Sequence, residues 1–173
     1  VRENVAENPK TGSLTLEEMA EHDAVIDVKL AALGNPNIPT RVIHRMAAGT
    51  GKRVRETIAG NISTPKTILM KSARDRDTNV AYNVACNPNV PREALTILAE
   101  RRNIGILVAV VRNKNTPEEA LAKLARNNNR NLRLLIAEHE NTSRETLEFL
   151  LLKAVKEADQ KLAETVRLAL AKQ

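Results

Sequence analysis

The sequence repeats itself every 26 residues, and this period limits the chain to a small set of folds. Residues 35–39 read "NPNIP" and residues 87–91 read "NPNVP", and looser spellings of the same turn stand one period after each of them. A proline column, three aliphatic columns and an asparagine column follow the same step. The asparagine column holds Asn35, Asn61, Asn87 and Asn113, with His139 next. A period of roughly 20 to 50 residues is typical of a solenoid, in which each unit buries its apolar face against its neighbours.

One unit, residues 113–138, contains two helix signals. Thr116 followed by Pro117 predicts an N-cap and a first helical residue, and Glu119 completes a capping box. The apolar residues of this first helix share one face, and the helix is expected to stop at "RNNNRN" because asparagine favours turns. A second apolar face follows at Leu132, Leu135 and Ile136. Each unit is therefore predicted to hold a first helix of about ten residues and a second of about eight, each followed by a turn.

The apolar composition agrees with an all-α fold. Of the 173 residues 42% are apolar, yet there is one Phe, one Tyr and no Trp, so the core must be built from Leu, Ile, Val and Ala, which favour helices. We predict a single α-solenoid domain over residues 1–173, with about six repeats of 26 residues. Residues 1–34 would form a partial and an irregular repeat, 35–138 four regular repeats, and 139–173 a C-terminal repeat with an extended capping helix.

The N-terminal end of the sequence opens inside a repeat. Residues 1–8, "VRENVAEN", match the second helix of a unit, as comparison with "VAYNVACN" at residues 80–87 shows. We therefore expect an upstream segment before Val1. The second helix of such a partial repeat leaves an apolar face uncovered, and uncovered apolar faces tend to mark interaction sites. Self-association through this uncapped N-terminal end is accordingly one predicted interaction.

The unit pattern resembles that of the leucine-rich repeat variant family, which is kin in architecture to HEAT-type repeats. The clearest copies are "NPNIPTRVIHRMAAGTGKRVRETIAG" and "NPNVPREALTILAERRNIGILVAVVR". The resemblance covers nearly the whole chain and implies a right-handed superhelix without a sheet, in which α-helices alternate with shorter, partly 3₁₀, helices. Some members carry an iron–sulfur module held by clustered cysteines, whereas this sequence has Cys86 alone. The resemblance therefore implies an architecture and no reaction.

The sequence offers no motif for catalysis. It has no nucleophile motif, no paired acids and no Gly-rich phosphate loop. The histidines His22, His44 and His139 stand at unlike repeat positions without metal-ligand spacing, so surface or interface roles are predicted for them. The asparagine column is predicted to be structural, with αL geometry and capping bonds to the backbone, rather than a ladder that binds a partner. We therefore predict a protein that is not an enzyme and uses neither a metal nor a cofactor.

Positive charge is concentrated in the middle of the sequence. The net charge is +6, but residues 41–133 carry eighteen Lys or Arg against seven Asp or Glu, whereas residues 1–40 are acidic. The turns between the two helices of successive repeats carry basic pairs, which stacking would align along one edge as a positive ridge. We name these residues the basic rim: Lys52, Arg53, Arg74, Arg76, Arg101, Arg102, Arg126 and Arg130. Three carboxylates are expected to interrupt it, at Asp75, Asp77 and Glu100.

Two functions stay open at this point. The first is a protein-binding scaffold, since solenoids offer extended binding surfaces. The alternative is sequence-tolerant binding of DNA or RNA, with the basic rim contacting phosphates. Because Tyr82 and Phe149 are the only aromatic residues, base stacking and base flipping are disfavoured. No apolar run approaches the roughly 20 residues that span a membrane, and the N-terminus lacks a signal-peptide pattern, so we predict a cytoplasmic protein with no membrane partner.

Overall fold

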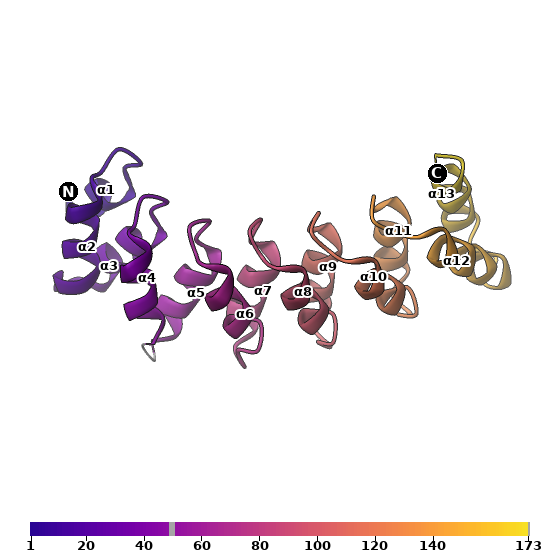
Figure 1. Ribbon diagram of the computed structural model, residues 1–173. Coiled ribbons are helices and arrows are strands. Elements are labelled where there is room, and N and C mark those ends of the chain that lie inside the picture. Colours follow the sequence, from indigo (N-terminus) through magenta and orange to yellow (C-terminus); the bar gives the residue numbers. More distant parts are fainter. Residues whose placement is uncertain (49–50, 173) are drawn as a thin grey trace. The chain divides into compact units, whose positions relative to one another are not determined.

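A computed structural model describes residues 1–48 and 51–172, and these residues form an all-α solenoid (Figure 1). They contain thirteen α-helices and no strand. A first helix, A, and a second helix, B, alternate along the chain, which begins with a B helix. The predicted all-α repeat fold is therefore confirmed. The 3₁₀ helices that the resemblance implies do not occur, since each helix of the described residues is an α-helix.

The A helices of the regular repeats are shorter than the B helices. The A helices are α2 (Ser13–His22), α4 (Thr40–Ala47), α6 (Lys66–Ser72), α8 (Arg92–Leu98), α10 (Glu118–Leu124) and α12 (Arg144–Lys156). The B helices are α1 (Arg2–Glu7), α3 (Ile26–Gly34), α5 (Lys52–Gly60), α7 (Thr78–Cys86), α9 (Ile104–Arg112), α11 (Arg130–Glu138) and α13 (Gln160–Leu170). In the regular repeats, the A helices α4, α6, α8 and α10 have 7 or 8 residues, whereas the B helices α5, α7, α9 and α11 have 9. The prediction that the A helix is the longer of the two is therefore wrong. The 13-residue α12 is the extended helix expected near the C-terminus.

Proline position explains the short A helices. Pro39, Pro65 and Pro117 have extended backbones and occupy the N-cap, so each helix begins one residue later than predicted. Thr116 does not cap the helix, and its hydroxyl donates to the Val110 carbonyl at the end of the preceding B helix. The predicted capping box is therefore wrong. Further threonines make the same bond six residues back: Thr11 to Val5, Thr64 to Ile58 and Thr142 to Ile136.

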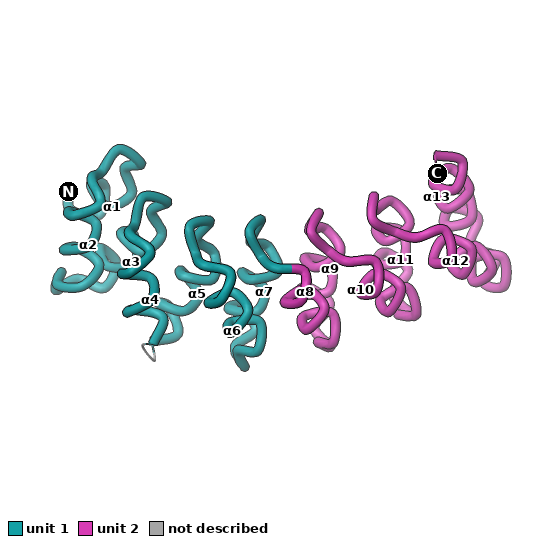
Figure 2. Tube along the Cα trace, viewed as in Figure 1, with its two compact units in different colours: residues 1–91 teal, residues 92–173 magenta. Residues whose placement is uncertain are grey.

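The chain divides into two compact units, Val1–Pro91 and Arg92–Gln173 (Figure 2). Unit 1 contains α1 to α7, and unit 2 contains α8 to α13. In unit 1, helix α5 packs against α3 and α7, and in unit 2, α11 packs against α9 and α13. Stacking of successive B helices is therefore common to both units, as expected for repeats that bury their faces on neighbours.

The predicted aliphatic columns form the core. The A-helix column is at most 1% exposed: Ile43, Leu69, Leu95, Leu121 and Leu147. The B-helix columns are equally buried, except that Val54 is half-buried. Burying one such side chain stabilises the fold by about 1.5 to 3 kcal/mol, which short helices of this kind cannot obtain alone. The aliphatic columns therefore hold the repeats together.

Side-chain caps begin the B helices α7, α9, α11 and α13, as well as the A helix α12. The carboxylate of Asp159 accepts the Leu162 N–H at 3.0 Å and also both guanidinium N–H groups of Arg130, at 2.6 and 2.8 Å. The bonds from Arg130 and from the Leu162 amide lower the pKa of the Asp159 carboxyl from its ordinary 3.8 to about 2. Asp159 therefore joins the starts of α11 and α13 in its ionised form.

Acid is expected to weaken the contact that Asp159 makes between the starts of α11 and α13. A carboxyl whose folded pKa lies below its unfolded pKa contributes stability that is complete above pH 3.8 and is lost as the pH falls to about 2. Asp159→Asn keeps an N-cap but removes the charge, so we expect a loss of about 1 kcal/mol at neutral pH and a shallower acid transition. Urea unfolding of both proteins across this pH range measures the difference. Identical pH dependence in the two proteins would contradict the assigned role.

Candidate functional site

The asparagine column forms a hydrogen-bonded ladder inside the protein. In unit 1 the Asn61 amide nitrogen donates to the carbonyls of Leu33, at 2.6 Å, and Asn35, at 3.0 Å. The Asn61 side-chain oxygen accepts the Ser63 N–H at 2.7 Å. Asn35 and Asn87 repeat this arrangement one period away. These side chains bind backbone carbonyls of the preceding repeat, so the predicted structural role is confirmed.

The predicted αL geometry is wrong for this column. Asn35, Asn61 and Asn87 have φ between −69° and −71° and an extended ψ. An extended residue turns the chain away from the B helix and lets its amide reach back to the previous repeat. The extended backbone of these asparagines is thus set by the side-chain bonds between repeats and not by the local preference of asparagine for turns.

His139 takes the place of asparagine in the fifth copy. Its Nδ1 accepts the Asn141 N–H at 3.0 Å, so its Nε2 carries the proton and donates to the Asn113 carbonyl at 3.1 Å. Where asparagine reaches two carbonyls of the preceding repeat, the imidazole reaches one. His139 is therefore a half-buried ladder member, a role that its place in the asparagine column signals.

Restoring asparagine should strengthen the ladder. His139→Asn adds a second donor, which we expect to bond the Val111 carbonyl and to raise the free energy of unfolding by about 1 kcal/mol. His44→Asn is the control, because His44 is exposed on α4 and outside the ladder, and no change is expected there. Urea unfolding measures both. A less stable His139→Asn protein would show that the imidazole fits this junction better than an amide.

Three basic-rim residues, Lys52, Arg53 and Arg130, form ion pairs between repeats. The carboxylates that seemed to interrupt the rim are partners of nearby basic residues: Asp75 pairs with Arg55, Asp77 with Lys52 and Glu100 with Lys123. Two further rim residues pair elsewhere, Arg53 with Asp27 and Arg130 with Asp159. The pairs of Lys52, Arg53 and Arg130 join B-helix starts of neighbouring repeats, so these three rim residues have a structural role.

Four rim arginines are exposed and form no ion pair within the described residues. Arg74 and Arg76 belong to the turn after α6 in unit 1, and Arg102 and Arg126 to the turns after α8 and α10 in unit 2. Arg101 is half-buried. Each unit therefore contains two exposed rim arginines that a ligand can reach. The sequence alone indicates eight such basic residues.

Unit 1 places Arg74 and Arg76 beside a groove of about 1040 Å³. The groove lies between α4, α5 and α6, and its lining includes Ala47, Ile68 and Met70. Ile68 is buried, and Ala47 and Met70 are half-buried. The cationic lining residues are Lys71, Arg74, Arg76 and Arg55. We call this the α4–α6 groove.

One carboxylate lines the α4–α6 groove, and Arg55 neutralises it. The Asp75 carboxylate accepts the Arg55 Nε–H at 2.7 Å and the Asp77 N–H at 2.9 Å. Burial by itself raises the pKa of Asp75, but these bonds outweigh it and hold the pKa below its ordinary value. The charges of Asp75 and Arg55 therefore cancel, and the three remaining cations leave the groove positive.

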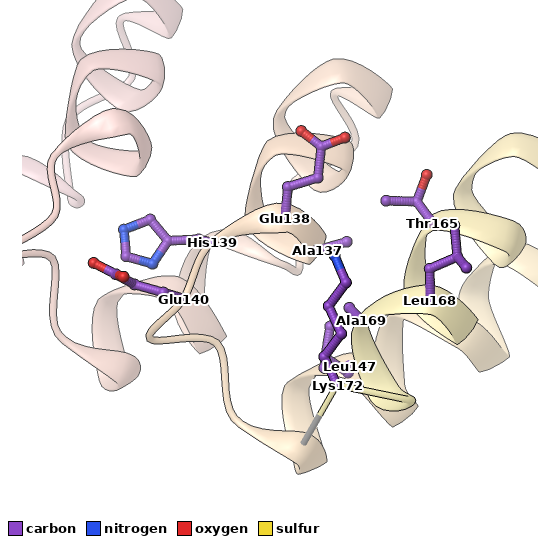
Figure 3. Close-up of a pocket in the computed structure, with 9 residues that line it drawn as sticks. All are labelled: Ala137, Glu138, His139, Glu140, Leu147, Thr165, Leu168, Ala169 and Lys172. Carbon is purple, nitrogen blue, oxygen red and sulfur yellow. The ribbon is translucent and has the colours of Figure 1, made fainter.

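A second hollow lies in unit 2 between the end of α11 and α13 (Figure 3). Its volume is about 490 Å³. Glu138 and Thr165 stand at one end, the Lys172 ammonium points toward Ala137, and His139 points away from α13 (Figure 3). His139 is already held in the ladder. The hollow thus combines opposite charges and brings no nucleophile and base together.

The described part of the chain has neither a cluster of metal ligands nor a helix that could span a membrane. Residues 1–48 and 51–172 contain no group of three His, Cys, Asp or Glu side chains that could hold a metal ion. None of their helices is long and apolar enough to cross a bilayer. Cys86 is the last residue of α7, is exposed and forms no disulfide.

The geometry agrees with comparison to solved structures. A structure described as "a leucine-rich repeat variant with a novel repetitive protein structural motif" matches 98% of this chain at 25% sequence identity, with a TM-score of 0.64. The chain is a helical repeat protein. This repeat protein spans 64% of the length of that structure.

Other comparisons add little about this repeat protein. A designed armadillo repeat protein matches 98% of the chain and 90% of its own length, at 14% identity and a TM-score of 0.34. No family model matches the sequence. No curated protein matches it either. The comparisons therefore bear on the fold, and the function must be argued from the surface.

Proposed function

We propose that this chain is a non-enzymatic repeat scaffold that binds a protein partner. The observation that carries the proposal is the α4–α6 groove, which combines half-buried apolar side chains with Lys71, Arg74 and Arg76, none of which forms an ion pair among the described residues. Protein interfaces typically join an apolar centre to a polar rim in which Arg is enriched. The asparagine ladder and the paired basic residues serve the fold, which leaves this groove as the best candidate surface.

Sequence-tolerant nucleic-acid binding is the second candidate. It is favoured by the four exposed arginines Arg74, Arg76, Arg102 and Arg126, which are free to contact phosphates. Two facts weigh against it. Three rim residues are engaged by carboxylates, and the described lining of the α4–α6 groove contains no Phe, Tyr or Trp on which a base could stack.

Affinity capture followed by a direct titration tests the proposal. The tagged chain should recover a defined protein at moderate salt after nuclease treatment, and the purified partner should bind it in calorimetry. Arg102→Glu together with Arg126→Glu should leave this binding unchanged. Recovery of nucleic acid alone, with an affinity that falls steeply between low and physiological salt, would replace the protein partner with the second candidate.

A further inference from the structure

We infer that the α4–α6 groove accepts an acidic segment of a partner protein that also carries an aliphatic side chain. The inference rests on the proposed scaffold function and adds the chemistry of the partner. Two features of unit 1 carry it: a local excess of positive charge, and apolar side chains directly beside that charge. The excess of positive charge distinguishes this groove from the neighbouring surface between α2 and α4.

The surface between α2 and α4 neutralises its own charge. Arg41 bonds Glu17, and Arg45 bonds both Glu17 and Glu21, so two arginines of α4 meet two carboxylates of α2. These bonds lower the pKa of Glu17, which keeps the carboxylate ionised. Carboxylates supplied by the protein itself thus occupy the basic side chains of that surface.

One period further along, the corresponding carboxylates are missing. Helix α4 presents His44 and Ala47 to the groove where α2 presents glutamates to its neighbour, and α6 and its turn add Lys71, Arg74 and Arg76. The groove's own carboxylate, Asp75, is taken by Arg55. A bound acidic side chain would therefore supply the charge that α2 supplies to α4. The guanidinium groups of Arg74 and Arg76 suit this role because each can hold a carboxylate with two parallel bonds.

The apolar lining favours a peptide over a nucleic acid. Ala47, Ile68 and Met70 offer aliphatic and thioether surface, and methionine adapts its shape to different apolar side chains. An aliphatic residue of a peptide would bury its surface here, whereas a phosphate backbone would leave this surface uncovered. An amphipathic acidic segment matches both parts of the groove, in the manner of helix-in-groove recognition.

Selection from a random-peptide phage library on the immobilised chain tests the inference without a known partner. We expect the enriched peptides to be rich in Asp and Glu and to share an aliphatic residue. A labelled peptide from that pool should bind about tenfold or more weakly to Arg74→Glu/Arg76→Glu, by fluorescence anisotropy. Replacing its aliphatic residue with serine should weaken binding to the unchanged chain.

The matched control is Arg102→Glu/Arg126→Glu, which changes the net charge equally at two exposed arginines of unit 2. It should leave the affinity unchanged within about twofold. Equal losses in the two double variants would overturn the inference, since general charge attraction would then explain binding. Enrichment of basic peptides, or no enrichment, would overturn it as well. Circular dichroism and thermal melting verify that both double variants are folded.

Failure of this inference differs from failure of the scaffold function. If a captured protein partner binds Arg74→Glu/Arg76→Glu as tightly as it binds the unchanged chain, the scaffold function stands and the groove is the wrong surface. If a single-stranded oligonucleotide binds and both double variants weaken it, the basic rim binds nucleic acid. The selected peptide, the captured protein partner and the oligonucleotide are three different probes of the same variants, so their results can be told apart.

Discussion

Asn61→Ala is expected to lower the free energy of unfolding by about 3 to 5 kcal/mol. The alanine removes two donors and one acceptor at once. It leaves the carbonyls of Leu33 and Asn35 without their amide partner and the Ser63 N–H without its acceptor. Asn61 is 4% exposed, so water cannot readily replace these bonds.

Asn37→Ala is the matched control for this prediction. Asn37 is exposed and lies in the turn one period before that of Asn61. Its amide donates to one carbonyl of the preceding repeat, that of Pro9. We expect a loss of about 0.5 kcal/mol or less, because water can take over an exposed bond. Urea unfolding followed by circular dichroism measures both proteins. Similar losses for Asn61→Ala and Asn37→Ala would show that burial of the ladder adds nothing to its bonds.

Asn61→Asp separates the two halves of the ladder. Aspartate keeps the acceptor for the Ser63 N–H but brings a negative charge against two carbonyl oxygens. We therefore expect it to be at least as destabilising as alanine at neutral pH. A milder effect would mean that the turn bond to Ser63, rather than the bonds between repeats, carries most of the stabilisation.

The period alone made most of the fold predictable. Because the repeated positions recur every 26 residues, the A-helix aliphatic column identifies the buried leucine of a repeat, such as Leu69 or Leu121. Local rules did less well. Thr116 and Glu119 satisfy the capping-box pattern, yet the Thr116 hydroxyl bonds Val110 instead. A local preference worth about 1 kcal/mol yields to a buried bond that closes the turn between two helices.

The candidate site was harder to predict than the fold. The sequence placed Lys52 and Arg74 in one class, basic residues of the turns, and treated Asp77 as an interruption. The structure pairs Lys52 with Asp77 at 3.1 Å, whereas Arg74 has no such partner within the described residues. Pairing depends on the angle at which the next repeat presents its turn, and a charge count carries no information on that angle. The positive charge of the α4–α6 groove comes from cations that have no ion-pair partner among the described residues. The groove could therefore be identified from the structure and not from the sequence.

Arg133 in unit 2 leads to the second large prediction. Its side chain is 4% exposed, and its guanidinium donates to the Glu157 carboxylate through Nη2 at 2.6 Å and Nη1 at 3.3 Å. The Nε atom is buried without a partner among the described residues. Glu157, at the end of α12, is 41% exposed. The cation of this pair is therefore deeply buried while its partner reaches solvent, and removal of each should have a different effect.

Glu157→Ala is expected to lower the free energy of unfolding by about 2 to 3 kcal/mol, because it leaves a buried guanidinium without its carboxylate. Asp159 cannot replace Glu157, since Arg130 and the Leu162 amide already occupy it. Urea unfolding at neutral pH measures the loss. Glu148→Ala is the control, because Glu148 is exposed on α12 and pairs with exposed Arg144, so a loss of about 0.5 kcal/mol or less is expected.

Arg133→Leu should cost much less than Glu157→Ala, although it breaks the same ion pair. Leu107 occupies the equivalent position one repeat earlier and is 3% exposed, so this site in a repeat can hold a leucine. Glu157 would stay hydrated, and no buried charge would be left behind. In Arg133→Leu/Glu157→Ala the second change should have almost no further effect. Equal losses for the two single variants would mean that the pair contributes through its mutual attraction rather than by neutralising a buried cation.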